Sequence, residues 1–245
     1  MRIFLAGATG AIGRRLTPLL LAAGHDVTGT TRSVDKAGEL KARGIEPAVV
    51  DAFDRDALLD AVVRARPEIV IHELTDLPQV FDPARRTEIL TRNAHLRGEG
   101  TASLMAAARA SGCRRVIAQS LAFIYATGPE PHLETDALAS AEGEGRDAIN
   151  ARGVRALEKA ALNAPGIEGI VLRYGLLYGP GTWFAGPTGP VPLHVDAAAC
   201  AAFLALSRGS PGIYNIADDC GAVSIEKARK GLGFDPTFRL EAALN

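Results

Sequence analysis

A glycine-rich heptapeptide, GATGAIG at residues 7–13, separates a short apolar run from a helical pattern that begins near residue 12. In such a turn Gly7 allows a sharp change of direction, Gly10 lets backbone approach a pyrophosphate, and Gly13 lets the helix pack closely on the strand. The first turn of the helix then offers unpaired N–H groups to phosphate. We therefore predict a nucleotide-binding loop, with a purely structural turn as the alternative, formed by Gly7, Ala8, Thr9, Gly10, Ala11, Ile12 and Gly13.

Short strand-like runs alternate with longer helical patterns along the first two-thirds of the chain. The runs are RIFLA, DVTGTT, PAVV, EIVIH, RRVIAQ and GIVLRY, and the helical stretches lie near 12–23, 34–43, 55–65, 84–111 and 147–163. This alternation is typical of βαβ units, in which right-handed crossovers place helices on both faces of a parallel sheet. The predicted fold class is therefore α/β, a Rossmann-type doubly wound parallel sheet with helices on both faces.

The composition changes at residues 179–192, GPGTWFAGPTGPVP, which are rich in proline and glycine and are predicted to be loop. A helical run, VDAAACAAFLALS, then a short strand, GIYNIA, and finally SIEKARKGLGF follow, too little for an independent domain. We expect a dinucleotide-binding Rossmann domain over 1–178. The C-terminal segment, 179–245, is expected to complete the sheet and to form a small, reduced substrate lobe.

The overall charge gives no reason to expect a nucleic acid or an anionic membrane as a partner. The chain has 27 basic and 28 acidic residues, for a formal net charge of −1. Its three cysteines are widely spaced, which argues against a disulfide framework, and no histidine has metal-ligand spacing. The start of the chain is too short for a signal peptide, and no apolar run reaches membrane-spanning length. We expect a cytoplasmic protein that binds a small molecule and no metal.

The second strand ends in TGTTRSVDKA, without the acidic residue that an NAD site usually carries there. Arg32 stands in this stretch instead, and a guanidinium suits the 2′-phosphate of NADP better than a free ribose hydroxyl. We therefore predict NADP(H) as the cofactor, with NAD as the alternative if Asp35 supplies the missing acceptor. Asp51, after the third strand, is predicted to accept from the adenine amino group, with helix capping before Arg55 as its alternative role.

Taken together, these motifs resemble the NAD-dependent epimerase/dehydratase family, an extended or atypical branch of the short-chain dehydrogenase/reductase superfamily. The resemblance rests on GATGAIG, VVDAFD, IVIHEL, GTASLMAAA, RRVIAQS, LRYGLLYGPG, VPLHVDAAACAAF and EKARKGLGF, so it covers nearly the whole chain. It implies a seven-stranded sheet and a dinucleotide cofactor. It also implies cofactor contacts from Asp51, Ala52, Leu74, Asn93, Tyr174 and Leu176.

The family's usual acid–base residues are missing from the sequence. Members pair a Tyr-x-x-x-Lys motif with a Ser or Thr, and the lysine lowers the tyrosine pKa so that the phenol exchanges a proton with the substrate. When Glu158 is aligned with the family's glutamate, Asn150 and Val154 take the tyrosine and lysine positions. Leu121 takes the position of the Ser or Thr.

Two hydroxyl residues remain as candidate proton donors near the end of the fifth strand. Tyr125 and Ser120 lie where ligands bind in α/β sheets, and either is a candidate substitute for the missing tyrosine. A packed aromatic ring is the alternative for Tyr125. Asn150 cannot titrate near neutral pH, but its amide is predicted to hydrogen-bond a ligand.

The C-terminal part is shorter than the family pattern. GPTGPVPLHVD and ADDCGAVSIEKAR join family landmarks almost directly, where members have further strands and helices that form a substrate lobe. Either the lobe was lost by a natural deletion or segments are missing from this sequence. We favour the second interpretation, and an intact mass clearly above 25.7 kDa would support it.

We therefore predict an NAD(P)-dependent oxidoreductase or epimerase/dehydratase-like enzyme that acts on a small or sugar-like substrate. A non-catalytic NADP(H)-binding sensor or scaffold is the alternative. The missing tyrosine and lysine favour the sensor, whereas the retained YGPG at 178–181 favours the enzyme. A homodimer through the two long helical stretches, 84–111 and 147–163, is compatible with the Ala and Gly residues along both.

Overall fold

The computed structural model describes residues 1–78, 80 and 82–240. Its main sheet has seven strands in the order β3-β2-β1-β4-β5-β6-β9, and all neighbouring pairs are parallel. This confirms the predicted α/β class and the number of strands. The strands are β1 (Arg2–Ala6), β2 (Asp26–Thr31), β3 (Glu46–Val49), β4 (Ile69–His72), β5 (Arg115–Leu121), β6 (Glu168–Tyr174) and β9 (Gly212–Ile216).

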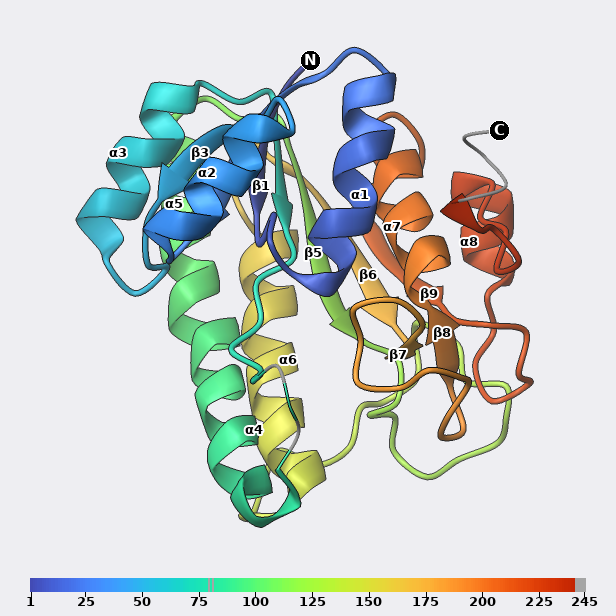
Figure 1. The fold of residues 1–245 in the computed structure, drawn as a ribbon. Helices are drawn as coiled ribbons and strands as arrows, with labels where there is room; N and C mark the ends of the chain where they lie inside the picture. The colour runs from blue at the N-terminus through green and yellow to red at the C-terminus, as the bar shows by residue number, and fades with distance from the viewer. Residues whose placement is uncertain (79, 81, 241–245) are drawn as a thin grey trace.

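Helices cover both faces of this sheet, as the alternating pattern predicted (Figure 1). Side chains of β1 alternate between the two faces, so that Ile3 and Leu5 belong to one apolar core and Phe4 to the other. The first core contains residues of α1 (Ala11–Ala22), α2 (Val34–Ala42), α7 (Val195–Leu204) and α8 (Glu226–Leu232). The second contains residues of α3 (Arg55–Ala65), α5 (Thr101–Ala110) and α6 (Arg146–Leu162).

The direction of the chain reverses across the sheet at β1. This strand pairs with β2 on one side and with β4 on the other. The chain runs outward from β1 through β2 to β3, and it then returns to place β4 on the opposite side of β1. Such a switch point is where dinucleotides bind in open α/β sheets, at the carboxyl ends of the strands. The residues that follow β1, β2, β4 and β5 therefore meet at one edge and form the candidate site.

The long helical stretch predicted at 84–111 is not one regular helix. A 3-10 turn, η1 (Pro83–Arg85), precedes α4 (Arg86–His95), and a π-helical turn, η2 (Leu96–Gly100), separates α4 from α5. Helix α4 packs closely on α6, because a Cβ atom at Gly153 would lie 2.9 Å from the Cα atom of Ala94. Small residues of α4 and α6 therefore allow these two helices to pack against each other within the chain. The homodimer remains a prediction.

The C-terminal segment adds β9 to the main sheet and α7 and α8 to one of its faces (Figure 1). The proline- and glycine-rich stretch is mostly loop, as predicted, but it is flanked by a short parallel pair that the sequence did not reveal. This pair joins β7 (Leu176–Tyr178) to β8 (Pro192–His194). Three-residue strands are too short to produce a recognisable alternation.

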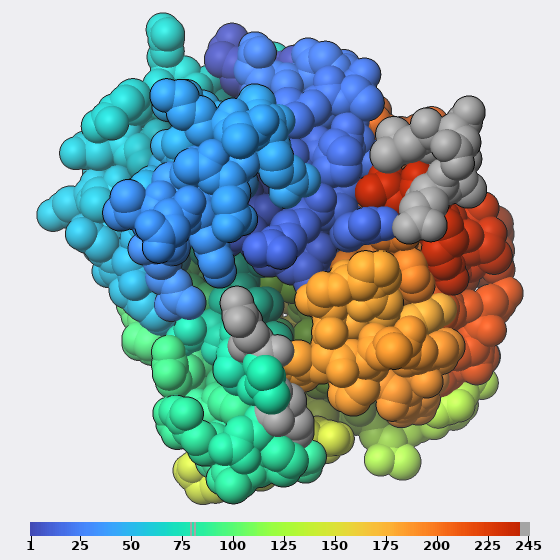
Figure 2. Space-filling model, in the orientation of Figure 1, coloured from blue at the N-terminus to red at the C-terminus, as the bar shows by residue number. Residues whose placement is uncertain are grey.

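The loop between β7 and β8 lies over the start of α1. A Cβ atom at Gly181 would be 4.0 Å from the Cα atom of Ala11, and the indole N–H of Trp183 donates to the carbonyl of Pro78 at 2.9 Å. Figure 2 shows this loop (orange) directly beside the blue N-terminal segment. The loop therefore covers the carboxyl edge of the sheet from the side of α1.

None of the helices in the described residues is both long and apolar enough to span a lipid bilayer. Within the same residues, no cluster of three or more His, Cys, Asp or Glu side chains has the geometry of a metal site.

Candidate functional site

The turn from β1 into α1 has the close backbone contacts that its glycines predicted. Gly7 has a φ of +98°, and a Cβ atom there would lie 2.6 Å from the carbonyl oxygen of Glu73. A Cβ atom at Gly13 would lie 2.8 Å from the Cα atom of Ala8. Gly10 caps α1 without a side chain, so the first N–H groups of the helix are left for an anion. The cradle formed by residues 7–13 therefore fits a pyrophosphate.

At the end of β2, Arg32 lies at the edge where the ribose of an adenine nucleotide would rest. Its Nη1 is 3.3 Å from Oδ1 of Asp76, and 59% of its side chain is exposed. The other carboxylate oxygen of Asp76 accepts from Nε of Arg92 at 3.0 Å, so this acid is already neutralised without Arg32. The Arg32 guanidinium is therefore able to turn toward a phosphate at little cost.

Three of the residues implied by the family resemblance form contacts within the protein at this edge. Asn93 accepts from the backbone N–H of Asp76 at 3.0 Å, and the carbonyl of Leu74 accepts from the side chain of Gln119 at 2.7 Å. Asp51 accepts from the N–H of Phe53 at 2.9 Å. These bonds fix the backbone after β3 and β4, where a dinucleotide would lie. Ala52 is buried beside them, and Leu176 begins β7.

The capping role considered for Asp51 belongs to another residue. Asp54 caps α3 by accepting from the N–H of Ala57 at 3.1 Å. The role of Asp51 toward adenine remains a prediction.

A buried carboxyl group next to the phosphate loop was missed in the sequence. Glu73 follows β4, and its Oε1 accepts from the hydroxyl of Tyr174 at 2.9 Å. Its Oε2 is buried and has no hydrogen-bond partner among the described residues. Burial raises the pKa of Glu73 to about 8, although the Tyr174 hydroxyl acts in the opposite direction. The only signal in the sequence was an acidic residue directly after an apolar strand, in IVIHE.

The two candidate proton donors belong to one buried hydrogen-bond network. Ser120 donates to Glu158 at 2.8 Å, and Arg173 makes two bonds of 2.8 Å to the same carboxylate. Arg173 also donates to the Tyr125 hydroxyl at 2.8 Å, and that hydroxyl donates to Asn215 at 2.6 Å. Burial raises the pKa of Tyr125, while Arg173 acts to lower it. Both hydroxyls are engaged in structure here, and their catalytic role remains a prediction.

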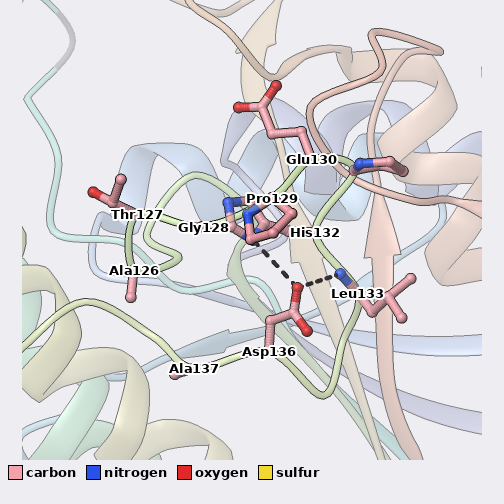
Figure 3. A pocket seen from close by; sticks show the side chains of 10 residues that line it. Ala126, Thr127, Gly128, Pro129, Glu130, His132, Leu133, Asp136 and Ala137 are labelled. Atoms are coloured by element: carbon pink, nitrogen blue, oxygen red, sulfur yellow. Dashed lines mark hydrogen bonds and ion pairs between the residues drawn. The ribbon is translucent and has the colours of Figure 1, made fainter.

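The loop after β5 lines an open pocket of about 400 Å³ (Figure 3). His132 stacks on the Tyr125 ring at a centroid distance of 4.9 Å. Its Nδ1 lies 3.2 Å from the carboxylate of Asp136, which also accepts from the N–H of Leu133 at 3.0 Å. His132 therefore belongs both to the lining of this pocket and to the stack on the Tyr125 ring.

The positions of the family's tyrosine and lysine contain no acid–base group. Val154 is fully buried and packs with Ile124 and Leu138. Asn150 is buried too, and its carbonyl oxygen lies 3.4 Å from Nη1 of Arg97. The helix that carries these positions is therefore retained, whereas the tyrosine and lysine side chains are not.

The sequence is similar to proteins of known family. The sequence profile of the NAD dependent epimerase/dehydratase family matches residues 3–199. The chain belongs to this family. Among curated proteins, a 3-diazoavenalumate denitrifying reductase of a Streptomyces species is 39% identical over all of this chain and 86% of the relative. That alignment runs over 267 positions, more than the 245 residues of this family member.

More distant relatives have the same architecture. A ketoreductase of Stigmatella aurantiaca, acting on a farnesylated quinoline oxide, is 28% identical over 80% of this chain and 55% of its own length. The solved UDP-glucose 4-epimerase of Thermotoga maritima superposes with a TM-score of 0.78 at 18% identity, covering 100% of this chain and 96% of that one. The UDP-glucose 4-epimerase of Thermus thermophilus in complex with NAD gives 0.72 at 22% identity, covering 96% and 85%. These structures show the shared Rossmann-type fold.

The buried Glu73 predicts that the stability of this protein depends on pH. Because the folded-state pKa is raised above the unfolded value, the stability that Glu73 contributes is present at acidic pH and is lost as the pH rises through about 8. We expect Glu73→Gln, which cannot ionise, to gain free energy of unfolding relative to wild type between pH 5 and pH 9, by about 4 kcal/mol. Urea denaturation at both pH values measures this difference.

An exposed glutamate in the loop before α6 provides the matched control. Glu142→Gln removes the same charge outside the core and is expected to follow wild type at both pH values. Equal pH dependence for Glu73→Gln and wild type would show that Glu73 is ionised when the protein is folded.

Proposed function

We propose that this protein is an NADP(H)-dependent reductase that transfers a hydride to the diazo group of a small carboxylate substrate, from which dinitrogen is released. The relative that is 39% identical over the whole chain is a reductase whose name specifies an organic anion with a diazo group. The single observation that carries the proposal to this chain is the replacement of the family's tyrosine and lysine by the buried Asn150 and Val154.

These replacements suit an acceptor that needs no proton donor. Reduction of a ketone produces an alkoxide, which the family's tyrosine normally protonates. A diazonium group is already cationic and accepts a hydride directly. A bound NADPH would supply this hydride, and the electron pair of the hydride would form an N–H bond at the terminal nitrogen of the substrate. The C–N bond would then break, the hydrogen would pass to the carbon, and dinitrogen would leave. Neither Asn150 nor Val154 has to exchange a proton in this sequence.

The residues of the chain bind and orient the reactants. The cradle at residues 7–13 is proposed to hold the pyrophosphate, with Arg32 beside the 2′-phosphate. The loop between β7 and β8, which contacts both Ala11 and Pro78, is proposed to exclude water from the site. Cofactor contacts from Asp51, Ala52, Leu74, Asn93, Tyr174 and Leu176 are part of the same proposal.

A cofactor-binding sensor or scaffold is the second candidate. It is favoured by the same two buried replacements and by the engagement of Ser120 and Tyr125 in the network around Glu158. The two functions differ in one observable, because a sensor binds NADP(H) without oxidising it when a substrate is added.

Cofactor choice is tested by titration of wild type and Arg32→Ala with NADP⁺, NADPH, NAD⁺ and NADH. We expect both NADP forms to bind wild type more tightly than the NAD forms. In the variant this preference is expected to fall about tenfold to a hundredfold, because charge-assisted bonds to the 2′-phosphate are lost. Arg109→Ala, which removes an exposed arginine from α5, is the matched control and should keep the wild-type preference. An unchanged preference in Arg32→Ala would contradict the assignment to NADP.

Activity is tested by following NADPH oxidation with 3-diazoavenalumate and with acetophenone, a simple ketone. We expect oxidation with the diazo compound only, because the site has no donor for an alkoxide. Oxidation with the ketone, or with neither compound, would contradict the proposed function.

Tyr125→Phe separates the proposed mechanism from one that uses Tyr125 as the proton donor. We expect the rate of NADPH oxidation with the diazo substrate to stay within about threefold of wild type. The free energy of unfolding should fall by about 1 kcal/mol, because Arg173 and Asn215 lose their shared partner. Ser120→Ala is tested in parallel. Loss of turnover in either variant, with NADP⁺ binding retained, would assign that hydroxyl a catalytic role.

A further inference from the structure

Arg97 is a buried cation that lacks an acidic partner. It lies in the π-helical turn η2 between α4 and α5, and only 4% of it is exposed. Its one hydrogen bond to the described residues runs from Nη1 to Oδ1 of Asn150 at 3.4 Å, and no carboxylate of those residues lies within 4.0 Å of it. Burial lowers the pKa of Arg97 to about 10, so the guanidinium is still charged at neutral pH.

The buried acidic side chains of the described residues are all assigned elsewhere. Glu158 is paired with Arg173, and Asp196 is paired with Arg15. Glu73 is bonded to Tyr174, and burial keeps its carboxyl protonated by raising its pKa to about 8. None of them offsets the charge of Arg97.

The buried imidazole of His72 does not offset this charge either. His72 is fully buried, its Nδ1 accepts from the N–H of Leu74 at 3.2 Å, and its Nε2 lies 2.8 Å from the hydroxyl of Thr101. Burial, and secondly the nearby Arg97, lower the pKa of His72 to about 4, so the ring is neutral. An unpaired buried charge costs several kcal/mol, and a bound ligand of opposite charge would offset that cost.

The Arg97 guanidinium lies beside the position where the family's tyrosine would stand. Asn150 occupies the place of the family's tyrosine, and α4 and α6 are in close contact at Ala94 and Gly153. The amide nitrogen of Asn150 has no hydrogen bond to any described residue, so it is free to donate beside the guanidinium. Single π-helical turns inside α-helices are common at functional sites.

We propose that Arg97 and Asn150 form a binding site for an oxyanion of the substrate, a carboxylate or phenolate held next to the hydride acceptor. A guanidinium donates two parallel N–H bonds to such a group, and the Asn150 amide supplies a third donor. This assignment rests on the proposed function, and it specifies the substrate class as an organic anion. It also explains why a residue that cannot titrate stands in the tyrosine position.

The test is a calorimetric titration of the protein saturated with NADP⁺, using cinnamate and its neutral analogue cinnamamide as probes. We expect wild type to bind cinnamate more tightly than cinnamamide. In Arg97→Met the affinity for cinnamate should fall at least tenfold, while the affinity for cinnamamide stays unchanged. Arg109→Met, which removes an exposed arginine from α5, is the matched control and should bind both probes like wild type.

Three results would overturn the proposal. The first is equal affinity of wild type for cinnamate and cinnamamide. The second is wild-type affinity of Arg97→Met for cinnamate, and the third is a tenfold loss of NADP⁺ binding in Arg97→Met. The last result would assign the charge to the cofactor phosphates. Because neither probe is reduced, these outcomes are independent of whether the protein reduces diazo compounds.

Folding is controlled in the same experiment. Removing an unpaired buried charge should leave the Tm of Arg97→Met equal to or above that of wild type. Arg97→Lys keeps the charge without the planar pair of donors and is expected to retain part of the discrimination. A loss of discrimination in Arg97→Lys as complete as in Arg97→Met would contradict a role for the charge itself.

Discussion

The close approach between the turn from β1 into α1 and the backbone of Glu73, which follows β4, sets the geometry of the candidate site. A side chain on Gly7 would collide with the carbonyl of Glu73, and one on Gly13 would collide with the turn itself. Only because these positions are bare can α1 start directly above the junction of β1 and β4. The start of α1 then meets the loop after β4 and the loop between β7 and β8 at one edge of the sheet.

A second constraint keeps α6 in place although its catalytic residues have changed. The Glu158 carboxylate receives two bonds from Arg173 on β6 and one from Ser120 on β5, and it thereby ties the helix to two strands. Breaking such a buried pair costs about 3–5 kcal/mol, so it preserves the helix under substitution at other positions. Asn150 and Val154 could replace an acid–base pair because the position of the helix does not depend on them.

Local patterns predicted most of the fold. The glycine spacing located the phosphate loop, and the apolar runs located the seven strands of the main sheet. The three-residue pair β7 and β8 was missed because its strands are too short for periodicity, and the π-helical turn at Leu96–Gly100 was missed because the apolar spacing continues through it. Both belong to the part of the structure that shapes the site.

The residues that define the chemistry depend on partners far away in the sequence, and this is why sequence patterns could not find them. The sequence left Tyr125 as either a candidate proton donor or a packed ring, and it could not show that the hydroxyl lies between Arg173 and Asn215. The sequence analysis made no prediction for Arg97, and only the folded chain shows that it is buried with no acid of the described residues beside it. The proposed site combines two features: the replacement of the family's tyrosine and lysine, and the buried charge of Arg97.

A reductase that removes a diazo group without a proton donor must convert every hydride into one molecule of dinitrogen. The most direct measurement is therefore the amount of dinitrogen released, by mass spectrometry with a heavy-nitrogen-labelled diazo substrate, against the amount of NADPH oxidised. Equal amounts of labelled dinitrogen and NADP⁺ are predicted. Oxidation of NADPH with the label retained in the organic product would contradict the proposed reaction. It would show that the protein reduces a different group of the substrate.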